Sequence, residues 1–526
     1  MILIYLIIIL ITGGLLALIV NRFSELASRV IALVAIITDL VLVISIWIKN
    51  YQEISLGSES WVIYFHQPWI ERFGIDWYFA LDGLSLLLLT LTFFLGIPAI
   101  LVSWSQVKEK VGFFHFNLLW LLAGITGVFL SMDMFLFYFF WEVMLIPMYF
   151  IIGIWGHEKR IYASFKFFIF TQASGLLMLL AILGLYFLHG QQTGIYTFAY
   201  EQLLETSLSS TLQYILMGGF LAAFLVKLPV VPFHNWLPDA HTEAPTAGSV
   251  LLAGLLLKTG AYGLLRFVIP LFPDAAVSFG PYGMFLGALS ILYGAKLAFA
   301  QTDMKRLVAY SSVSHMGFVL LGVFAFTELA YQGVVIQMLA HGISTSALFI
   351  LVGGVQERLH TRDIIKIGGM WKSVPKMGAM ALLFAMASLG LPGLGNFIAE
   401  FFILAGSFPA SVLWTVVASF GLVAATLYSL RMFQKAFQGK PVTSTSLKDL
   451  NAREISIMFL LTAAILWLGL YPKNVLETSS GSLKKILDHP AIELQINHLG
   501  LVNEKLPDDY SQRKEEDLML KQRNYD

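Results

Sequence analysis

The chain has 526 residues, of which 58% are hydrophobic and 13% charged, and its formal net charge is zero. Soluble domains carry about a quarter charged residues, so this composition excludes an ordinary soluble domain and indicates a polytopic membrane protein. The zero net charge argues against a nucleic-acid partner. The chain has no cysteine, which excludes disulfides, Cys-ligated iron–sulfur clusters and Cys-ligated structural zinc, so any redox cofactors would lie in other subunits.

Apolar segments long enough to cross a bilayer recur along the whole chain. A span needs about 20 apolar residues, and this criterion predicts an all-α protein with about fourteen transmembrane helices. No basic residue precedes the first segment, so we expect a retained span and not a cleaved signal peptide. The segments lie near residues 2–20, 29–48, 80–103, 112–131, 133–155, 163–188, 211–237, 247–271, 280–299, 304–325, 330–354, 376–406, 411–432 and 455–472.

Alternate connections between these segments carry most of the positive charge. Because Lys and Arg favour the cytoplasmic side, this set is predicted to be cytoplasmic and both termini to lie outside. The outer loop 51–79 is rich in aromatic residues and predicts an interfacial belt or a packed hairpin, and the polar tail 473–526 is expected to be solvated. The basic residues of the cytoplasmic set are Arg22, Arg29, Lys108, Lys110, Lys159, Arg160, Lys305, Arg306, Arg358, Arg362, Lys366, Lys372, Lys435, Lys440, Lys448 and Arg453.

Glu142 lies in the middle of the segment 133–155, among aromatic residues. A carboxylate at this depth costs a few kcal/mol, so it must face a partner or water, and we expect a functional role in preference to a structural ion pair. Lys166 begins the next span. It either extends its ammonium to the cytoplasmic interface or takes part in function, and the sequence does not separate the two.

The segment 211–237 combines a lysine with helix-breaking prolines. Pro229 and Pro232 remove two amide donors just after Lys227, so the helix is expected to break there. Broken backbone at membrane depth is tolerated where it lines a cavity or packs against protein. Lys258 then falls in the middle of the following span, so this region places two lysines within the membrane.

Polar residues form stripes on the segments 304–325 and 330–354. His315 shares a face with two serines, and His341 lies on a stripe with Gln337 at helical spacing. A single membrane histidine is more often structural, but two on neighbouring stripes favour a hydrated path. No His, Asp or Glu spacing indicates a metal site.

The segment 376–406 has glycines and Pro392 at mid-span and carries Glu400. It resembles the broken segment 211–237, five spans earlier. Because five is an odd number, the second copy is predicted to be inverted, which gives two five-helix repeats (helices 4–8 and 9–13) with broken helices 7 and 12. The predicted units are residues 1–110, the first repeat 111–272, the inverted repeat 273–433, a loop with the last helix at 434–472, and the tail 473–526. No nucleotide-binding motif is found.

Several motifs together resemble a known family. The runs from Lys227 to Lys258 and from Asp303 to Gly317, and Leu391-Pro392-Gly393 leading to Glu400, are similar to the proton-pumping antiporter-like subunits. The runs Phe137 to Met148 and Lys166 to Gly175 support the same resemblance. This family includes chains of respiratory complex I (NADH:quinone oxidoreductase), of multisubunit Na+/H+ antiporters and of membrane-bound hydrogenases. The resemblance covers helices 3–13 well and the ends of the chain poorly.

The resemblance implies a proton channel made of two half-channels that meet at the membrane midplane. Glu142 and Lys227 correspond to a charge-paired switch, Lys258 to a central lysine, His315 and His341 to relay positions, and Glu400 to the terminal proton carrier. Other family members have a lysine at this last position. Protons would pass from Lys258 by way of His315, His341 and water to Glu400.

The same resemblance implies the partners and cofactors. The chain would bind other membrane-arm subunits of complex I, especially neighbouring antiporter-like chains, in the bacterial plasma membrane. NADH, FMN, iron–sulfur clusters and quinone would be bound in partner subunits, with none in this chain. Two alternatives stay open: a subunit of a Na+/H+ antiporter that works without redox partners, and a passive structural spacer in which the buried charges are inert ion pairs.

Overall fold

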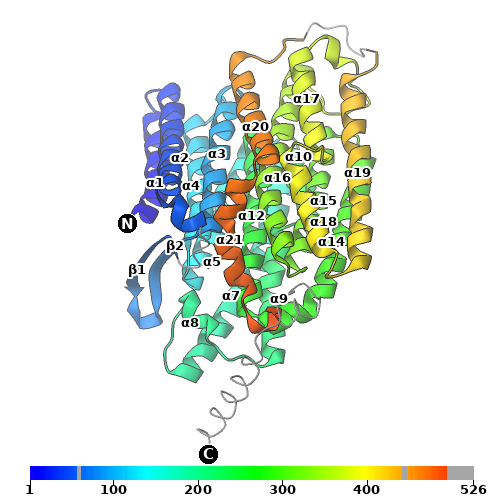
Figure 1. Ribbon diagram of the computed structural model, residues 1–526. Helices are drawn as coiled ribbons and strands as arrows, with labels where there is room; N and C mark the ends of the chain where they lie inside the picture. The colour runs from blue at the N-terminus through cyan, green and yellow to red at the C-terminus, as the bar shows by residue number, and fades with distance from the viewer. Residues whose placement is uncertain (56–60, 441–446, 494–526) are drawn as a thin grey trace, which may run out of the picture.

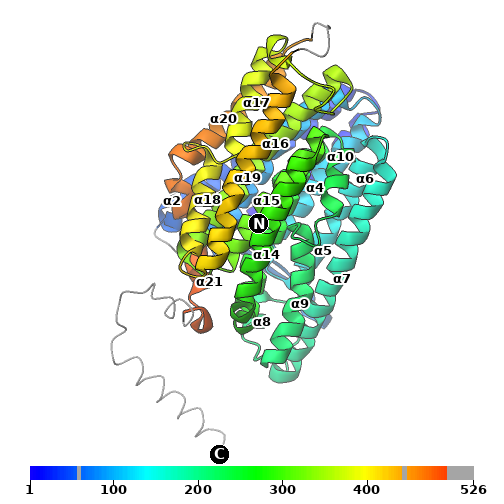
Figure 2. The ribbon, with the colours of Figure 1, turned by 90° about the vertical axis from the view of Figure 1, so that its right-hand side faces the viewer.

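The computed structural model describes residues 1–55, 61–440 and 447–493 and is mostly helical. Long helices run roughly parallel to one another in a single bundle (Figure 1). In the view of Figure 2, α5, α6, α7 and α9 lie on one side of the bundle and α17, α18 and α19 on the other, with α14 and α15 between them. Thirteen helices of the described part are long and apolar enough to cross a membrane.

The element bounds are as follows. The structure has α1 Ile2–Val20, α2 Glu25–Ser55, β1 Ile63–Ile70, η1 Glu71–Phe73, β2 Ile75–Leu81, α3 Gly83–Gln106, α4 Val111–Leu130, α5 Met134–Val143, α6 Leu145–Trp155, α7 Arg160–Thr193, α8 Tyr200–Leu204, α9 Ser210–Lys227, α10 Trp236–Glu243, α11 Thr246–Leu251, η2 Leu252–Leu256, α12 Leu257–Gly263, η3 Leu264–Val268, α13 Ile269–Leu271, α14 Pro273–Ala300, α15 Met304–Val323, α16 Glu328–Leu359, η4 Met370–Lys372, α17 Pro375–Ser388, α18 Gly395–Ser407, α19 Val412–Phe437, α20 Ala452–Leu470 and α21 Lys473–Leu487.

The predicted twelfth span accounts for the difference between thirteen and fourteen helices. It consists of α17 and α18, each shorter than a full span, separated by the glycine-rich stretch that carries Pro392. Gly390 and Gly393 have φ values of +81° and +94°, a backbone region that residues with a Cβ rarely adopt. The two short helices together fill this predicted segment, so the all-α, many-span architecture is confirmed.

Proline also interrupts two other spans. The helix α9 ends at Lys227 and α10 begins at Trp236, with Pro229 and Pro232 in the connection. The predicted helix 133–155 is divided at Met144 into α5 and α6. Pro147 lies four residues after Val143 and lacks the amide that would bond its carbonyl, which explains this interruption. The inverted repeat itself stays a prediction.

The centre of the bundle is formed by the span 246–271 and by α16, whose most apolar windows are both fully buried. The span 246–271 is not a uniform α-helix, because η2 and η3 are π-helical turns on either side of α12. Each π turn accommodates an extra residue and changes which backbone carbonyls are free, and such turns are frequent at functional sites.

Residues 61–81 form a two-stranded antiparallel hairpin with Ile63 opposite Leu81. The expected packed hairpin is thereby confirmed for this part of the loop, while residues 56–60 lie outside the described residues. Isolated bridges join Phe79 to Ser131 and Asp133 to Ala199, so the hairpin and the segment around α8 lie at the same end of the bundle (Figure 1). We call this the hairpin end.

The expectation of a solvated tail is wrong for residues 473–487. These residues form α21, which packs against α2, α3 and α16 and fully buries Val475 and Leu483. The segment was missed because α21 is amphipathic and short, so it fails a criterion based on mean hydropathy over a membrane-spanning length. The remainder of the predicted tail, 494–526, lies outside the described residues.

The other end of the bundle gathers the connections that carry the predicted cytoplasmic charges, and we call it the basic end. The Arg29 side chain donates to the carbonyl of Val107 (3.2 Å), and the Met304 amide donates to the carbonyl of Arg362 (3.0 Å). The Arg362 side chain in turn donates to the carbonyl of Thr242 (2.6 Å). These contacts bring together connections that are far apart in the sequence.

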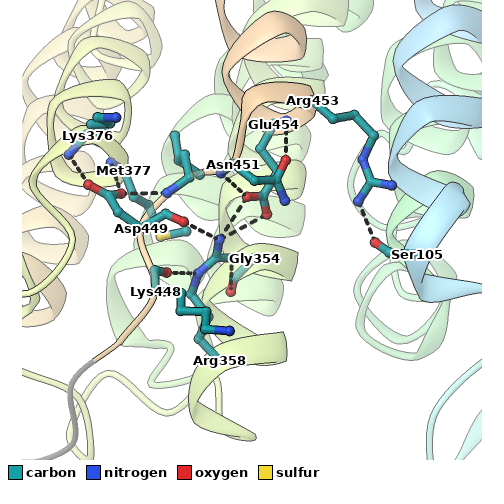
Figure 3. A network of polar contacts seen from close by, with 11 residues as sticks. Ser105, Gly354, Arg358, Lys376, Met377, Lys448, Asp449, Asn451, Arg453 and Glu454 are labelled. Carbon is teal, nitrogen blue, oxygen red and sulfur yellow. Dashed lines mark hydrogen bonds and ion pairs between the residues drawn. The ribbon is translucent and has the colours of Figure 1, made fainter.

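A compact polar network ties three helices at the basic end (Figure 3). Arg358, in the last turn of α16, contacts both carboxylate oxygens of Glu454 at 2.8 and 3.1 Å. Asp449 accepts hydrogen bonds from the amides of Lys376 and Met377 at the start of α17. Asn451 and Glu454 form a capping box at the start of α20. The network thus fixes α16, α17 and α20 relative to one another.

Candidate functional site

Lys258 is fully buried at the middle of the span 246–271. Its ammonium donates to the carbonyl of Ala253, which lies in the π turn η2, so the irregular backbone supplies an acceptor that a regular α-helix would not offer. The second contact of the ammonium is Nδ1 of His341 on α16, at 2.7 Å. A buried lysine is therefore held by a π-helical carbonyl and an imidazole, and no carboxylate of residues 1–55, 61–440 and 447–493 lies within 4.0 Å of it.

His341 in turn lies next to His315. The two rings lie with their centroids 5.5 Å apart, and both side chains are almost completely buried. Nδ1 of His315 is 2.8 Å from Oε1 of Glu400, and the amide of Gln337 donates to the same oxygen at 3.3 Å. The polar groups therefore follow the order Lys258, His341, His315, Glu400, which we call the central row. The order of the two histidines is the reverse of the expected one.

Three helices other than α16 hold the far end of the central row. Nε2 of His315 is 3.2 Å from the Tyr428 hydroxyl of α19 and 3.3 Å from the Ser388 hydroxyl at the end of α17. Glu400 lies on α18 and is 1% exposed. The break between α17 and α18 thus places the end of one short helix and the beginning of the next around one imidazole and one carboxylate.

A cavity of about 310 Å³ adjoins Glu400 between α18 and α19. Its walls are otherwise mostly apolar, and the second carboxylate oxygen, Oε2, has no hydrogen-bond partner among the described residues. A volume of this size holds several water molecules, and a carboxylate supplies acceptors for them. The terminal carboxylate of the central row therefore lies beside space that water can fill.

Lys227 lies in the last turn of α9 and is 1% exposed. Its ammonium is 4.9 Å from the ring centroid of Trp141 and 5.8 Å from that of Phe167, so aromatic faces provide part of its stabilisation. Glu142 follows Trp141 directly, on α5, and packs its carboxylate against Gly175, where a Cβ would approach Oε1 to 2.5 Å.

Glu142 and Lys227 do not form an ion pair within 4.0 Å in this structure. The Lys227 ammonium and Oε1 of Glu142 have no hydrogen-bond partner among the described residues. The two groups are near neighbours through Trp141 but are separated. The expected pairing stays a prediction, and in the conformation described the two side chains make no direct contact.

Lys166 is held by a partner that the sequence did not identify. Its ammonium is 2.7 Å from Oδ2 of Asp239 on α10, and the other carboxylate oxygen contacts Arg306 at 3.1 Å. The two cations share one carboxylate near the basic end of the bundle. This arrangement is a structural clamp on α10, the short helix that follows the break at Lys227.

Sequence reasoning missed Asp239, Tyr428 and Ser388. Asp239 carried a usable signal, because it lies between prolines in a stretch already marked as unusual. Tyr428 and Ser388 carried none, because single tyrosines and serines are common on apolar helices, and a serine hydroxyl usually bonds its own helix backbone. Among the residues that the structure describes, no group of three or more His, Cys, Asp or Glu side chains could hold a metal ion.

The chain was compared with known families and sequences. Residues 131–426 match the family model described as NADH:quinone oxidoreductase/Mrp antiporter, transmembrane. NADH-quinone oxidoreductase subunit M of Pseudomonas aeruginosa is 53% identical over 494 residues, which cover 92% of this chain and 97% of that protein. Subunit M of Escherichia coli K12 is 52% identical over 496 residues, with the same coverage.

The fold is similar to solved structures of large membrane complexes. A chain of respiratory complex I from Thermus thermophilus with bound NADH aligns with a TM-score of 0.82 and 31% identity, covering 92% of this chain and 99% of that chain. A chain of the Mrp complex from Dietzia sp. aligns with a TM-score of 0.81 at 20% identity, covering 94% and 98%, and at this identity the likeness shows the fold alone. The family expected from the motifs is confirmed: the chain belongs to the NADH-quinone oxidoreductase subunit M family, within the complex I and Mrp antiporter group.

Proposed function

We propose that the chain translocates protons as a membrane subunit of an NADH:quinone oxidoreductase. The observation that carries the proposal is the central row, in which Lys258, His341, His315 and Glu400 follow one another through buried contacts. Each of these groups can bind and release a proton. A carboxylate and a lysine in a membrane are costly, and such groups line ion and proton pathways far more often than they serve packing.

Glu142 and Lys227 are proposed to act as the switch that loads the central row. An opposite charge nearby favours the protonated form of a lysine, and burial disfavours it. When Glu142 approaches Lys227, the lysine retains its proton. When Glu142 moves away from Lys227, the lysine is free to pass its proton toward Lys258; the absence of a direct contact between the two side chains here is compatible with such movement.

The energy for proton movement has to come from outside the chain. The chain lacks cysteine, and its buried groups are acids, bases and hydroxyls, which transfer protons but not electrons. We therefore assign NADH, FMN, the iron–sulfur clusters and quinone to partner subunits of the complex. Membrane-arm subunits, especially neighbouring antiporter-like chains, are the proposed direct partners, in a bacterial plasma membrane with both termini on the outer side and the basic end in the cytoplasm.

The proposal is tested in the assembled complex, reconstituted into vesicles with NADH and quinone. The variants Glu142→Ala and Lys227→Ala are expected to abolish proton pumping by this chain, so that fewer protons move for each NADH oxidised, while quinone reduction is only slowed. Lys366→Ala, a change to an exposed lysine of the connection 360–374, serves as the matched control. An assembled Lys227→Ala complex that pumps as many protons per NADH as the wild type would overturn the proposal.

The antiporter alternative receives less support. The relatives that are more than half identical are named as subunits of NADH-quinone oxidoreductase, and the Mrp likeness rests on the fold alone. The passive-spacer alternative predicts that a charge-neutral double substitution, Glu142→Gln with Lys227→Met, leaves pumping intact. Our proposal predicts its loss.

A further inference from the structure

A second set of buried polar side chains extends from Lys258 toward the hairpin end. Lys258 and Tyr262 lie four residues apart on α12 and therefore share one face of the helix. Arg266 follows in the π turn η3, with its guanidinium carbon 5.4 Å from the ring centroid of Tyr262. All three side chains are buried, in a span with no exposed residue in its apolar window. We call Lys258, Tyr262, Arg266 and Asp82 the hairpin-side file.

Arg266 forms an ion pair with Asp82 at the start of α3. Both side chains are less than a tenth exposed, so the pair is shielded from bulk water. Asp82 also caps α3 by accepting the amide of Ser85 at 3.0 Å. The carboxylate is thus fixed in place by the helix that it caps, and it fixes the guanidinium in turn.

A second set of contacts joins Tyr262 to Asp82. The Tyr262 hydroxyl donates to the carbonyl of Phe129 (3.2 Å) and lies 3.3 Å from the hydroxyl of Ser85. Ser85 is the residue whose amide Asp82 accepts. Polar contacts therefore continue from Tyr262, one helical turn from Lys258, to the end of the bundle, both through Arg266 and through Ser85.

Beyond Arg266, the file reaches the surface at the hairpin end. The guanidinium carbon is 5.3 Å from the ring centroid of Trp61, whose indole N–H donates to Glu201 at 2.6 Å. The ammonium of Lys485 lies 5.1 Å from the same indole. Glu201 and Lys485 are both exposed. Arg266, Asp82 and the Trp61 side chain thus connect buried Tyr262 with exposed residues at this end of the bundle.

Arg266 differs chemically from the other members of the file. A lysine or a tyrosine can exchange a proton, but a guanidinium keeps its charge at every physiological pH. A fixed positive charge in a narrow polar path repels protons, and channels that exclude protons use an arginine in this way. The guanidinium is where a proton relay along this face would stop.

We propose that the Arg266–Asp82 pair is a plug that prevents protons on Lys258 from leaking to the hairpin end along the hairpin-side file. The inference rests on the proposed function, since it takes Lys258 to be a proton carrier. A proton-carrying lysine one helical turn from polar groups that reach the surface would dissipate the gradient unless that route were closed. The ion pair closes it, and the carboxylate stabilises a charge that the membrane interior would otherwise disfavour.

The test measures passive proton leak through the assembled complex in vesicles, as the decay of an imposed pH gradient without NADH. The double variant Asp82→Asn with Arg266→Gln removes both charges, and asparagine retains the helix cap. A leak several-fold faster than that of the wild type is expected. Lys485→Gln, which removes an exposed cation at the same end, is the matched control and is expected to leak no more than the wild type. A double variant that assembles and leaks no faster than the wild type overturns the proposal.

A further substitution identifies the route. Adding Lys258→Gln to the double variant is expected to abolish the extra leak, and a leak that persists without Lys258 overturns the assignment of this path. Should the double variant not assemble, Arg266→Lys places a group that can release its proton beside Asp82, and it is expected to leak faster than the wild type at pH 9. Equal leak at that pH overturns the proposal.

The outcome separates this proposal from the proposed function. If Lys227→Ala pumps fully but the plug variant leaks through Lys258, the switch is wrong and the plug stands. If Lys227→Ala abolishes pumping and the plug variant leaks no faster than the wild type, the switch stands and the plug is wrong.

Discussion

The pKa of a single carboxyl group in this chain depends on its burial and on its hydrogen bonds. Asp133 caps α5 and accepts the amides of Leu136 (2.9 Å) and Asp76 (3.0 Å) at the hairpin end, just outside the membrane-spanning segment. Burial raises the pKa of Asp133 to about 6, from a usual value of 3.8, in spite of these two hydrogen bonds, which favour the ionised form. A residue whose position is set by a helix start can therefore be poised to titrate near neutral pH.

This pKa predicts a local pH dependence of stability. Because the folded-state pKa is raised, Asp133 contributes stability that is fully present below pH 4 and is lost as the pH rises through 6. Hydrogen exchange of the peptide 131–140 in the intact complex, corrected for intrinsic rates, should show falling protection between pH 4 and 7. Asp133→Asn retains the cap and is expected to show no such fall. The peptide around Ser411, an N-cap that does not titrate, is the internal control. An equal loss of protection in Asp133→Asn would contradict the assignment of this pH dependence to Asp133.

At the scale of elements, the network of Figure 3 anchors α16, the helix that carries His341 of the central row. Arg358 terminates α16, the helix of His341 and Gln337, and joins it to Glu454 and to the carbonyls of Lys448 (2.6 Å) and Asp449 (3.2 Å). One guanidinium thus satisfies a partly buried carboxylate and two backbone acceptors, those of exposed Lys448 and partly buried Asp449.

Arg358→Ala would leave these acceptors without a donor. The cost is about 1–3 kcal/mol, and it should appear as a lower temperature of thermal dissociation of the purified complex. Arg453→Ala is the matched control, because Arg453 lies in the first turn of α20 and its guanidinium makes one hydrogen bond among the described residues, to Ser105 (2.6 Å). An equal decrease in the dissociation temperature of the two variants would show that the network does not stabilise the position of α16.

At the scale of the whole molecule, α21 closes the bundle between α2, α3 and α16 near the hairpin end. Thr478 accepts a hydrogen bond from the indole of Trp47 (3.0 Å), and Glu477 accepts one from Tyr51 (2.6 Å). The Ser482 hydroxyl accepts the amide of Leu84, beside Asp82. The helix therefore supports the start of α3, where the plug is anchored.

Truncation after Pro472 is expected to reduce the yield of assembled complex several-fold, because it exposes the apolar faces that α21 covers. Truncation after Glu493 removes none of the contacts described and should leave the yield near that of the wild type. Native gels of detergent-solubilised membranes measure both. An unchanged yield for the shorter chain would show that α21 is dispensable for packing.

Much of this organisation could be predicted from the sequence, and the exceptions have physical reasons. Hydropathy identifies spans, and the cost of burying charge marks Glu142, Lys227, Lys258 and Glu400 as exceptional. Prolines and glycines mark the breaks. The pairing of Lys258 with His341 could not be predicted, because the two are 83 positions apart and only helix packing brings them together. The separation of Glu142 from Lys227 depends on side-chain conformation, which the spacing of residues does not determine.

The depth of the central row has an electrical consequence. Lys258 lies near the middle of the span 246–271, and His341 and His315 lie near the middle of α16 and α15, so the row runs across the bundle and not along it. Moving a unit charge through the full membrane potential costs about 2.3 kcal/mol per 100 mV, but movement parallel to the membrane plane crosses little of that potential. Transfer along the row should therefore be nearly independent of voltage. The voltage-dependent work falls on the steps that connect the row to the two surfaces.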